Sequence, residues 1–505
     1  MTELHTHPLL DYRVCEQARL SRDARFDGLF FTGVVSTRIY CRPVCPAPPP
    51  KPQNVRYYTN AAAAEAAGFR PCLRCRPELA PGNAVWKRGE HAVARALKLI
   101  DMGVLTEHSL DELATRVGVS ARQLRRLFVE YLGVPPISVH TTNRLLFAKQ
   151  LLTETAMPIT DVALAAGFRS VRRFNAAFSQ ANRMPPRELR RKPRANVSDA
   201  LVLRLAYRPP YDFNALLAFL RIRALPGVER IDEHAYARVF GTGAAPGWLR
   251  LSAWPGNEHA LKLELHGAKP TQMLPVITRL RKMFDLDADP QMIAATLGRE
   301  GVLKPLLRKH PGLRLPGGWD GFEIAVRAVL GQQVSVAAAR TLATRMAQRF
   351  GEPLAPPAIP GLQRLFPTPE QLADADLRPL GVTAARAATI RAVARGLLDG
   401  KLEFRSEQPL EEFVARWIAL PGIGAWTAHY VALRALSHPD AFPAADLILR
   451  RAAAGGGAEL STKALEVLAN TWRPWRAYAA IHLWRSSADA VSISKTPRTA
   501  RRRCP

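Results

Sequence analysis

The pattern of hydrophobic and polar positions changes several times along the chain. Residues 28–41, GLFFTGVVSTRIYC, are rich in β-branched and aromatic residues, which is typical of strands joined by a hairpin. The prolines of CPAPPPKP at 45–52 exclude a helix or a central strand because proline has no backbone N–H. The alanine-rich run at 61–69 predicts a short helix that Gly68 ends. The pattern therefore predicts a small domain of strands and a short helix near the N-terminus.

Helical periodicity dominates from about residue 90 to 190. Residues 109–133 predict a helix, a tight turn at Gly118 and a second helix, and residues 159–180 repeat this plan with a turn at Gly167. Two consecutive helix-turn-helix units are expected. The N-caps predicted for the second helix of each pair are Ser120 and Ser170.

Strand-like patterns return after a polar, basic linker at 190–199. LVLRLAYRPPYDF at 201–213 and LKLELHG at 261–267 predict an antiparallel sheet that continues to about residue 290. From there to about residue 490 the pattern is almost entirely helical, and a basic, solvated tail follows at 495–505.

Composition indicates the class of partner. The 505 residues are 48% apolar, enough for several packed cores, and carry a formal net charge of +28, which favours a polyanionic partner. Nucleic acid is the first choice and an anionic membrane surface the second. Charged residues interrupt every candidate membrane span, and the N-terminus has no apolar signal core. Six cysteines in a chain of this length do not form a disulfide framework, so a reducing cytoplasm is expected.

Four cysteines stand in two close pairs, C-x3-C and C-x2-C, inside one basic N-terminal stretch. Two such pairs separated by an insert have the spacing by which thiolates bind Zn²⁺ tetrahedrally. The spacing alone favours a structural zinc site over a reactive one, and both interpretations stay open at this point. The remaining cysteines, Cys15 and Cys504, are expected to be a buried or a tail thiol. The predicted ligands are Cys41, Cys45, Cys72 and Cys75.

The second helix of each helix-turn-helix unit carries side chains that can read DNA. Arginine binds guanine edges and phosphates, and asparagine can read adenine. A single unit could equally be an ordinary helical hairpin with a charged outer face, but two arginine-rich units favour DNA binding. The pair resembles the AraC-type DNA-binding domain. The candidate readers are Arg122, Gln123, Arg125 and Arg126 in the first unit and Arg169, Arg172, Arg173 and Asn175 in the second.

The sequence segments around the cysteines are more specific to one family than the cysteine spacing is. FFTGVVSTRIYCRPVC, NVRYY and AAGFRPCLRCRP resemble the N-terminal domain of Ada methyl-phosphotriester repair proteins. The resemblance implies that Cys41 is both a zinc ligand and the methyl acceptor, and that Cys45, Cys72 and Cys75 are ligands only. It also implies that methylation of Cys41 strengthens DNA binding and activates transcription. The chain lacks the Pro-Cys-His-Arg motif of the Ada domain that repairs O6-methylguanine, so that activity is not expected.

The string ALPGIGAWTAHYVALRAL at 419–436 predicts a helix, a tight hairpin and a helix. Gly422 and Gly424 allow close approach of the backbone to a DNA phosphate, with a monovalent cation as a possible ligand of the hairpin. Asp446 follows at the expected start of another helix, where an N-cap is the simplest role. Asp440 is a competing carboxylate that we expect to be a surface turn residue.

These motifs resemble helix-hairpin-helix DNA glycosylases of the AlkA type, in matching order over about 280 residues. The resemblance implies that Asp446 is the catalytic carboxylate and that Trp426, Tyr430 and Trp484 line a cleft for a flipped, cationic base. Bifunctional relatives carry a lysine where this chain has Trp426, so a monofunctional enzyme is expected. AlkA-type enzymes can insert a leucine into the space that the flipped base leaves in the duplex, and this chain has Gln333 at that position. The other tryptophans considered, Trp319, Trp472 and Trp475, are expected to be core.

The sequence therefore predicts a multidomain α+β protein. We expect a sensor of alkyl damage on DNA that also hydrolyses the N-glycosidic bond of alkylated bases of the 3-methyladenine type. RNA polymerase is an expected partner, and the protein is expected to be a monomer at the bacterial nucleoid. The alternatives are a transcription regulator whose glycosylase half only binds DNA, and a glycosylase with a purely structural zinc domain. The predicted boundaries are 1–85 (zinc domain), 86–192 (helix-turn-helix domain), 198–290 (antiparallel-sheet α+β domain), 291–490 (helix-hairpin-helix glycosylase domain) and 491–505 (disordered tail).

Overall fold

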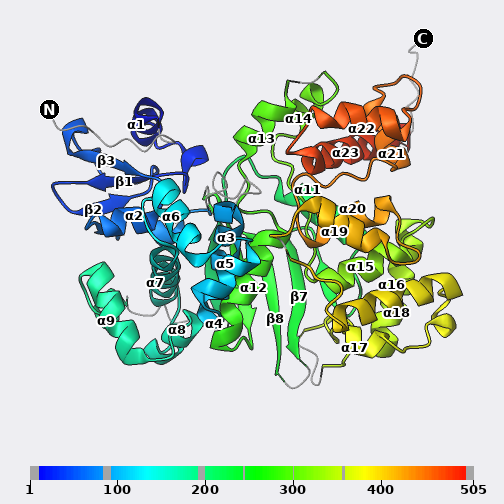
Figure 1. Cartoon of the computed structure of the whole chain (residues 1–505), viewed down its shortest axis with the longest axis horizontal. Helices are drawn as coiled ribbons and strands as arrows, with labels where there is room; N and C mark the ends of the chain where they lie inside the picture. The colour runs from blue at the N-terminus through cyan, green and yellow to red at the C-terminus, as the bar shows by residue number, and fades with distance from the viewer. Residues whose placement is uncertain are drawn as a thin grey trace, which may run out of the picture.

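Each change in the hydrophobic pattern corresponds to a change of architecture in the computed structural model (Figure 1). We refer to four stretches as the cysteine unit (11–82), the helix-turn-helix unit (92–190), the sheet unit (200–299) and the helical unit (301–495). The predicted linker at 190–199 lies almost wholly outside the described residues. The structure describes residues 11–82, 92–190, 200–242, 245–256, 258–299, 301–354, 359–405 and 407–495.

The cysteine unit is built on a four-stranded sheet with the order β3-β1-β2-β4, and the hairpin predicted at 28–41 forms its strands β1 and β2. Strand β1 pairs antiparallel with β2 and β3, and β2 pairs parallel with β4. Helix α2 packs on the sheet around the buried rings of Phe31, Tyr40 and Phe69. Gly68 ends this helix with a φ of 84°. The bounds are α1 Tyr12–Leu20, η1 Ala24–Phe26, β1 Phe31–Val34, β2 Ile39–Cys41, η2 Pro52–Asn54, β3 Val55–Tyr58, α2 Ala61–Ala66, β4 Arg70–Pro71 and η3 Pro77–Leu79.

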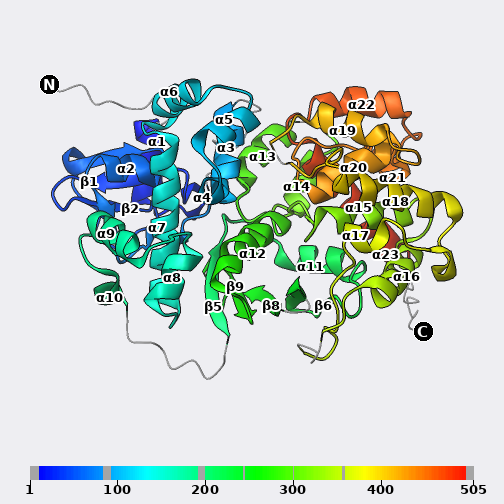
Figure 2. The same ribbon diagram turned by 60° about the horizontal axis from the view of Figure 1, so that its bottom comes forward.

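The helix-turn-helix unit contains the two predicted pairs, α5/α6 and α8/α9. The hydroxyls of Ser120 and Ser170 accept the backbone N–H groups of Gln123 and Arg173, so both predicted N-caps are confirmed. Helix α7 has 19 residues, about 28 Å at 1.5 Å per residue, and α6 and α9 lie at its opposite ends (Figure 2). The bounds are α3 Ala92–Asp101, α4 Val104–Glu107, α5 Leu110–Arg116, α6 Ala121–Leu132, α7 Pro136–Glu154, α8 Ile159–Ala165, α9 Val171–Asn182 and α10 Pro186–Leu189.

The sheet unit is a five-stranded antiparallel sheet with the order β5-β9-β8-β7-β6. The predicted extension of the sheet to about residue 290 is wrong, because strand β9 ends at His266 and helix α12 follows. After Gly267 the buried positions change to the helical spacing of Met273, Val276, Ile277 and Leu280. The bounds are β5 Leu201–Ala206, α11 Phe213–Arg221, β6 Glu229–Ile231, β7 Ala235–Thr242, β8 Ala245–Ala253, β9 Ala260–His266, α12 Pro270–Met283 and α13 Pro290–Leu297.

The helical unit surrounds one large apolar core, in which Trp472 and Trp475 are buried as expected. Trp319 is buried as well, against the core of the sheet unit. Helix α23 continues to Lys495, so residues 491–495 of the predicted disordered tail are helical. No described helix is both long and apolar enough to cross a lipid bilayer. The bounds are α14 Lys304–Lys309, α15 Gly321–Leu330, α16 Val336–Phe350, α17 Pro369–Leu372, η4 Arg378–Leu380, α18 Ala384–Leu398, α19 Leu410–Ile418, α20 Ala425–Ala435, α21 Leu447–Ala453, α22 Thr462–Asn470 and α23 Arg476–Lys495.

Candidate functional site

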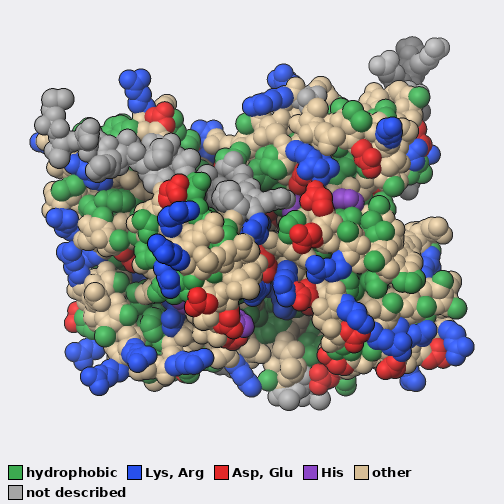
Figure 3. Space-filling view, viewed as in Figure 1, with side chains coloured by type: hydrophobic (Ala, Val, Ile, Leu, Met, Phe, Trp, Pro, Cys, Tyr) green, Lys and Arg blue, Asp and Glu red, His purple; other side chains and the backbone are tan. Residues whose placement is uncertain are grey.

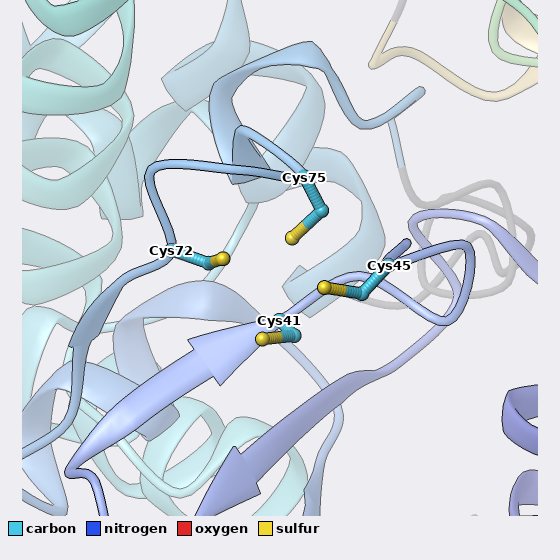
Figure 4. Close-up of side chains that lie close together, drawn as sticks. All are labelled: Cys41, Cys45, Cys72 and Cys75. Atoms are coloured by element: carbon cyan, nitrogen blue, oxygen red, sulfur yellow. The ribbon is translucent and has the colours of Figure 1, made fainter. Parts of the chain in front are cut away.

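The four predicted cysteine ligands converge at one point of the cysteine unit (Figure 4). Their Sγ atoms all lie within 4.8 Å of one another. Cys41 ends strand β2, and the parallel pairing of β2 with β4 brings the C-x2-C loop beside the C-x3-C loop. Four thiolates at this separation match the donor set and tetrahedral size that Zn²⁺ takes in structural sites. The cluster therefore fits a single zinc ion.

The four sulfur atoms differ in their surroundings. Cys72 and Cys75 are buried, whereas Cys41 and Cys45 are partly exposed. Backbone N–H groups of Arg42 and Arg74 donate to the sulfurs of Cys75 (3.3 Å) and Cys72 (3.4 Å), and the N–H of Ala47 donates to that of Cys45. Within the described residues no backbone N–H donates to Cys41. Such bonds draw charge from a thiolate, so Cys41 is the partly exposed sulfur of the set without a backbone N–H donor among the described residues.

The predicted DNA readers lie on the exposed faces of helices α6 and α9, except Arg169, which lies in the turn before α9. Their helices are anchored by the opposite faces, where Leu124 and Phe128 of α6 and Phe174 and Phe178 of α9 are fully buried. On the face drawn in Figure 3, Lys and Arg side chains gather along the edge formed by this part of the chain. The exposed readers are Arg122, Gln123, Arg125, Arg126, Arg169, Arg172, Arg173 and Asn175.

The hairpin between helices α19 and α20 (419–424, the Gly422 hairpin) requires glycine at one of its two predicted glycine positions, Gly422. Gly422 has a φ of 82°, and a Cβ atom there would lie 2.1 Å from Oγ1 of Thr389. Gly424 is the N-cap of α20 without a side-chain cap, and a Cβ there would meet open space. The first N–H groups of α20 therefore face solvent and can bind an anion.

Asp446 is held by groups from three helices. Its Oδ1 accepts the backbone N–H groups of Ile448 and Leu449, both at 3.0 Å, which confirms the predicted N-cap of α21. The indole Nε1 of Trp426 on α20 donates to Oδ2 at 2.9 Å, and Nε1 of Trp484 on α23 donates to Oδ1 at 3.2 Å. The side chain remains partly exposed. The carboxylate is thus fixed in place and still accessible to a ligand.

The three predicted cleft aromatics lie together beside Asp446. Trp426 stacks on Tyr430 with ring centroids 5.1 Å apart, and Trp484 meets Tyr430 edge-on at 6.4 Å. Arg434 Nη1 donates to the Tyr430 hydroxyl oxygen at 2.9 Å. Burial raises the pKa of Tyr430, but the charges of Arg434 and Arg223 outweigh it and lower that pKa below its ordinary value. The sequence placed these three rings in one cleft, and the structure brings them together.

Gln333 is presented on the exposed loop between α15 and α16. Its φ of 54° lies in the left-handed region, which a residue other than glycine rarely adopts. Gln332, whose contact role the sequence did not reveal, donates from Nε2 to the carbonyl of Gly422 (2.8 Å) and to Oγ1 of Thr427 (3.1 Å). The loop that carries Gln333 is therefore tied to the Gly422 hairpin.

Two predictions about the remaining candidates have opposite outcomes. Asp440 is not a surface turn residue: it is only 7% exposed and forms ion pairs with Arg473 and Arg476, whose charges compensate its burial. Cys15 is the buried thiol that was expected. Cys504 lies outside the described residues.

Comparison with known proteins assigns each unit to a family. Four family models match: "Metal binding domain of Ada" at 14–78, "Helix-turn-helix domain" at 113–192, "AlkA N-terminal domain" at 202–320 and "HhH-GPD superfamily base excision DNA repair protein" at 326–477. The chain is therefore similar to a DNA-binding regulator in its first half and to a DNA glycosylase in its second.

Individual relatives cover the same two halves. The "Probable bifunctional transcriptional activator/DNA repair enzyme AlkA" of Mycobacterium tuberculosis is 39% identical over 95% of this chain and 98% of its own length. "DNA-3-methyladenine glycosylase 2" of Escherichia coli is 36% identical over 55% of this chain and 95% of its own. "Bifunctional transcriptional activator/DNA repair enzyme Ada" of Escherichia coli is 38% identical over 30% of this chain and 41% of its own.

Proposed function

Because the chain belongs to the family of bifunctional transcriptional activator/DNA repair enzymes in which an Ada-like regulator is fused to an AlkA-type DNA glycosylase, we propose that it performs two reactions on alkylated DNA. One is transfer of a methyl group from a DNA methyl-phosphotriester to Cys41. The other is release of alkylated bases by hydrolysis of the N-glycosidic bond with Asp446.

The single observation that carries the glycosylase proposal is the placement of Asp446 against two indole N–H groups and beside the stacked rings of Trp426 and Tyr430. A flipped 3-methyladenine is cationic and is attracted to the faces of these rings. The Asp446 carboxylate then stabilises positive charge that develops at C1′ and orients the attacking water. Trp426 has no amine that could form a Schiff base, so the product is an intact strand with an abasic site.

Single-turnover base release from alkylated duplex DNA tests this role. Asp446→Asn removes the negative charge, and we expect the rate to fall by about a thousandfold while DNA binding is retained. The matched control is Asp374→Asn, whose carboxylate is exposed and pairs with Arg395. Undiminished release by Asp446→Asn would refute the catalytic role of Asp446, whereas no release by the wild-type protein would favour the alternative of a regulator with an inactive glycosylase half. A borohydride-trapped protein–DNA adduct would contradict the monofunctional mechanism.

For the methyl transfer, the Cys41 sulfur attacks the methyl carbon in line with the ester oxygen. The S–C bond forms as the C–O bond breaks, and its electron pair stays on the phosphate oxygen, which restores the anionic diester. Zn²⁺ bound to Cys41, Cys45, Cys72 and Cys75 would keep the sulfur deprotonated at neutral pH. The thioether is not released, so each molecule reacts once.

Comparing the two partly exposed cysteines tests the acceptor. We expect Cys41→Ser to accept no labelled methyl group from DNA carrying methyl-phosphotriesters, and the label in the wild type to be found on Cys41 by peptide mass spectrometry. Cys45→Ser is the matched variant, because Cys45 is also a partly exposed member of the cluster but receives the Ala47 N–H. Label on Cys45 in the wild type would overturn the assignment, and label on neither would favour a purely structural zinc site.

Methylation removes one negative charge from a site of net charge near −2 and so weakens its repulsion of phosphates. On this basis we propose that Cys41 methylation strengthens promoter binding through α6 and α9. In this proposal the protein acts as a monomer at the bacterial nucleoid and contacts RNA polymerase. Equal promoter affinity before and after methylation would contradict the switch. A monovalent cation at the Gly422 hairpin remains a prediction, which potassium dependence of DNA binding would test.

A further inference from the structure

One buried arginine joins the cysteine unit to the sheet unit. Arg208, which follows strand β5, is 0% exposed. Its Nε donates to the carbonyl oxygen of Asp27 at 2.8 Å and its Nη1 to that of Asp287 at 2.8 Å, while Nη2 donates to the carbonyl of Gly82. Two of these acceptors lie in the cysteine unit and one in the sheet unit. A buried guanidinium needs all of its acceptors, so the two units depend on each other for this one side chain.

The contact is reinforced from the opposite direction. The backbone N–H of Gly82 donates to Oδ1 of Asp287 at 2.7 Å, and Arg281 also pairs with that carboxylate. A Cβ atom on Gly28 would lie 2.1 Å from the carbonyl oxygen of Pro81, so only glycine permits this approach. Segment 281–289 of the sheet unit is thus bonded directly to Gly82 of the cysteine unit, and through Arg208 to Asp27.

The contact made by Arg208 is connected to the four cysteines through Asp27 and Arg42. Asp27, whose carbonyl accepts from Arg208, pairs through its carboxylate with Arg42. Arg42 follows the ligand Cys41 directly, donates from its backbone to the sulfur of Cys75 and donates from Nη1 to the carbonyl of Cys75 at 3.0 Å. The position of Asp27, and with it one acceptor of Arg208, therefore depends on the folded ligand loops.

A second route starts at the residue after Cys75. Arg76 pairs with Glu154 of helix α7 at 3.3 Å. Oε2 of Glu154 accepts the backbone N–H of Arg204 in strand β5 at 3.0 Å, and Gln150 donates to the Arg204 carbonyl. Both routes begin next to a metal ligand and end at strand β5 or the turn that follows it.

The packing beside these polar contacts is not continuous. A cavity of about 860 Å³ borders it, and its lining includes Gly28, Gly82, Arg204, Arg281 and Asp287. A docked arrangement that includes buried hydrogen bonds beside a cavity can be lost without unfolding the sheet unit.

We propose that the cysteine unit is a docked partner of the glycosylase half, and that metal binding at the four cysteines sets the local stability of segment 281–289 through Arg208. The proposal needs a metal at the cluster but not methyl transfer to Cys41 or base release by Asp446. It can therefore fail while both reactions stand, and it can hold if either reaction is absent.

Amide hydrogen exchange of the full chain, with zinc and after chelation, tests the coupling. In the wild type we expect chelation to raise exchange in peptides covering 281–289 by about tenfold, which corresponds to about 1.4 kcal/mol of local stability. Peptides covering 425–453, which carry the Asp446 cleft, should keep their protection. Arg208→Lys keeps the charge but cannot reach all the acceptors, so 281–289 should already exchange faster with zinc bound and should respond less to chelation.

Arg19→Lys is the matched control. Arg19 is also buried, but it pairs with Glu16 and donates to Tyr57 inside the cysteine unit. We expect it to leave exchange at 281–289 and its response to chelation as in the wild type. Asp27→Asn, which weakens the pair with Arg42, provides a second disruption from the cysteine side. The proposal is wrong if chelation leaves exchange at 281–289 of the wild-type protein unchanged. It is also wrong if Arg208→Lys shows the full response to chelation, or if chelation lowers protection uniformly along the chain.

Discussion

The cysteine cluster and the Asp446 cleft both hold an anionic group ready for DNA, but they balance its charge differently. Four sulfurs within 4.8 Å of one another receive few N–H donors, so the cluster needs a metal ion to exist as thiolates. Asp446 instead receives four N–H donors from the protein itself. In the proposed function the first group is changed once, and the second must return unchanged after every turnover.

Metal removal should separate the two sites most strongly. Chelation, or Cys72→Ser, should unfold the sheet of the cysteine unit and abolish methyl acceptance, because a structural zinc ion contributes on the order of 10 kcal/mol or more. Base release by the Asp446 cleft should persist. Circular dichroism together with single-turnover excision would measure both. Cys15→Ser, a buried cysteine of the same unit outside the cluster, is the control; parallel loss of base release on chelation would show that the cleft also depends on the metal.

Low pH should lower the stability of the glycosylase half around Asp446 through two buried histidines. Nδ1 of His429 accepts the N–H of Phe442, and Nδ1 of His438 accepts that of Asp440, so both rings must be neutral at that atom. Burial lowers the pKa of His429 to about 4 and that of His438 to about 3, against about 6.5 in the unfolded chain. Between these values the unfolded chain binds more protons. The stabilisation is therefore fully present above about pH 6.5 and is lost as the pH falls towards 4.

We expect the free energy of unfolding of the glycosylase half to fall by about 1.4 kcal/mol per pH unit for each histidine in this range. Denaturant unfolding between pH 7 and 4.5, followed by tryptophan fluorescence, measures the slope. His429→Asn keeps an acceptor but cannot titrate there and should lower the slope by about 1.4 kcal/mol per pH unit, with the share of His438 remaining. His234→Asn, at an exposed position, should leave the slope unchanged. An identical slope in wild type and His429→Asn would contradict this origin of acid sensitivity.

Local chemistry was predictable, whereas contacts between distant segments were not. Ser120, Ser170 and Asp446 are N-caps because each stands directly before a helical pattern, and this signal is contained in a few neighbouring residues. The paired cysteines are equally local. Asp440 was misplaced because its partners Arg473 and Arg476 lie more than 30 residues away, and no periodicity announces such pairs.

The same limit applies to the contents of the candidate site. The resemblance grouped Trp426, Tyr430 and Trp484 correctly, but not the hydrogen bonds of the two indoles to Asp446, since a ring in a cleft can face a carboxylate with its edge or its plane. In the sequence, Arg208 is one basic residue among many and stands before a pair of prolines. Its buried role depends on carbonyl groups from residues 27 and 82, far away in the chain.

The two indole donors allow a finer test of how the protein, rather than a metal, fixes Asp446. Trp426→Phe and Trp484→Phe each remove one N–H donor and keep an aromatic ring in the cleft. We expect each to slow single-turnover base release about tenfold, the loss of one hydrogen bond to a charged group, with little change in binding of DNA that contains an abasic site. Trp248→Phe in the sheet unit, where the ring stacks on His266, is the control. Unchanged rates would mean that the N-cap alone positions the carboxylate.

Gln333 should give the smallest effect, because the wedge role implied by the resemblance acts on the DNA rather than on the reacting groups. Its side chain is exposed, so Gln333→Ala should leave stability nearly unchanged and weaken binding to duplex DNA about threefold to fivefold by removing a side chain that fills the space of the flipped base. Gln333→Leu should restore or exceed wild-type binding, because an apolar wedge fills that space without a polar group to desolvate. Gln348→Ala, an exposed glutamine on α16, is the control. Equal binding by all four proteins would mean that Gln333 is not a wedge and that the bond of Gln332 to the hairpin serves another purpose. Methyl acceptance at the cysteine cluster should be the same in each protein.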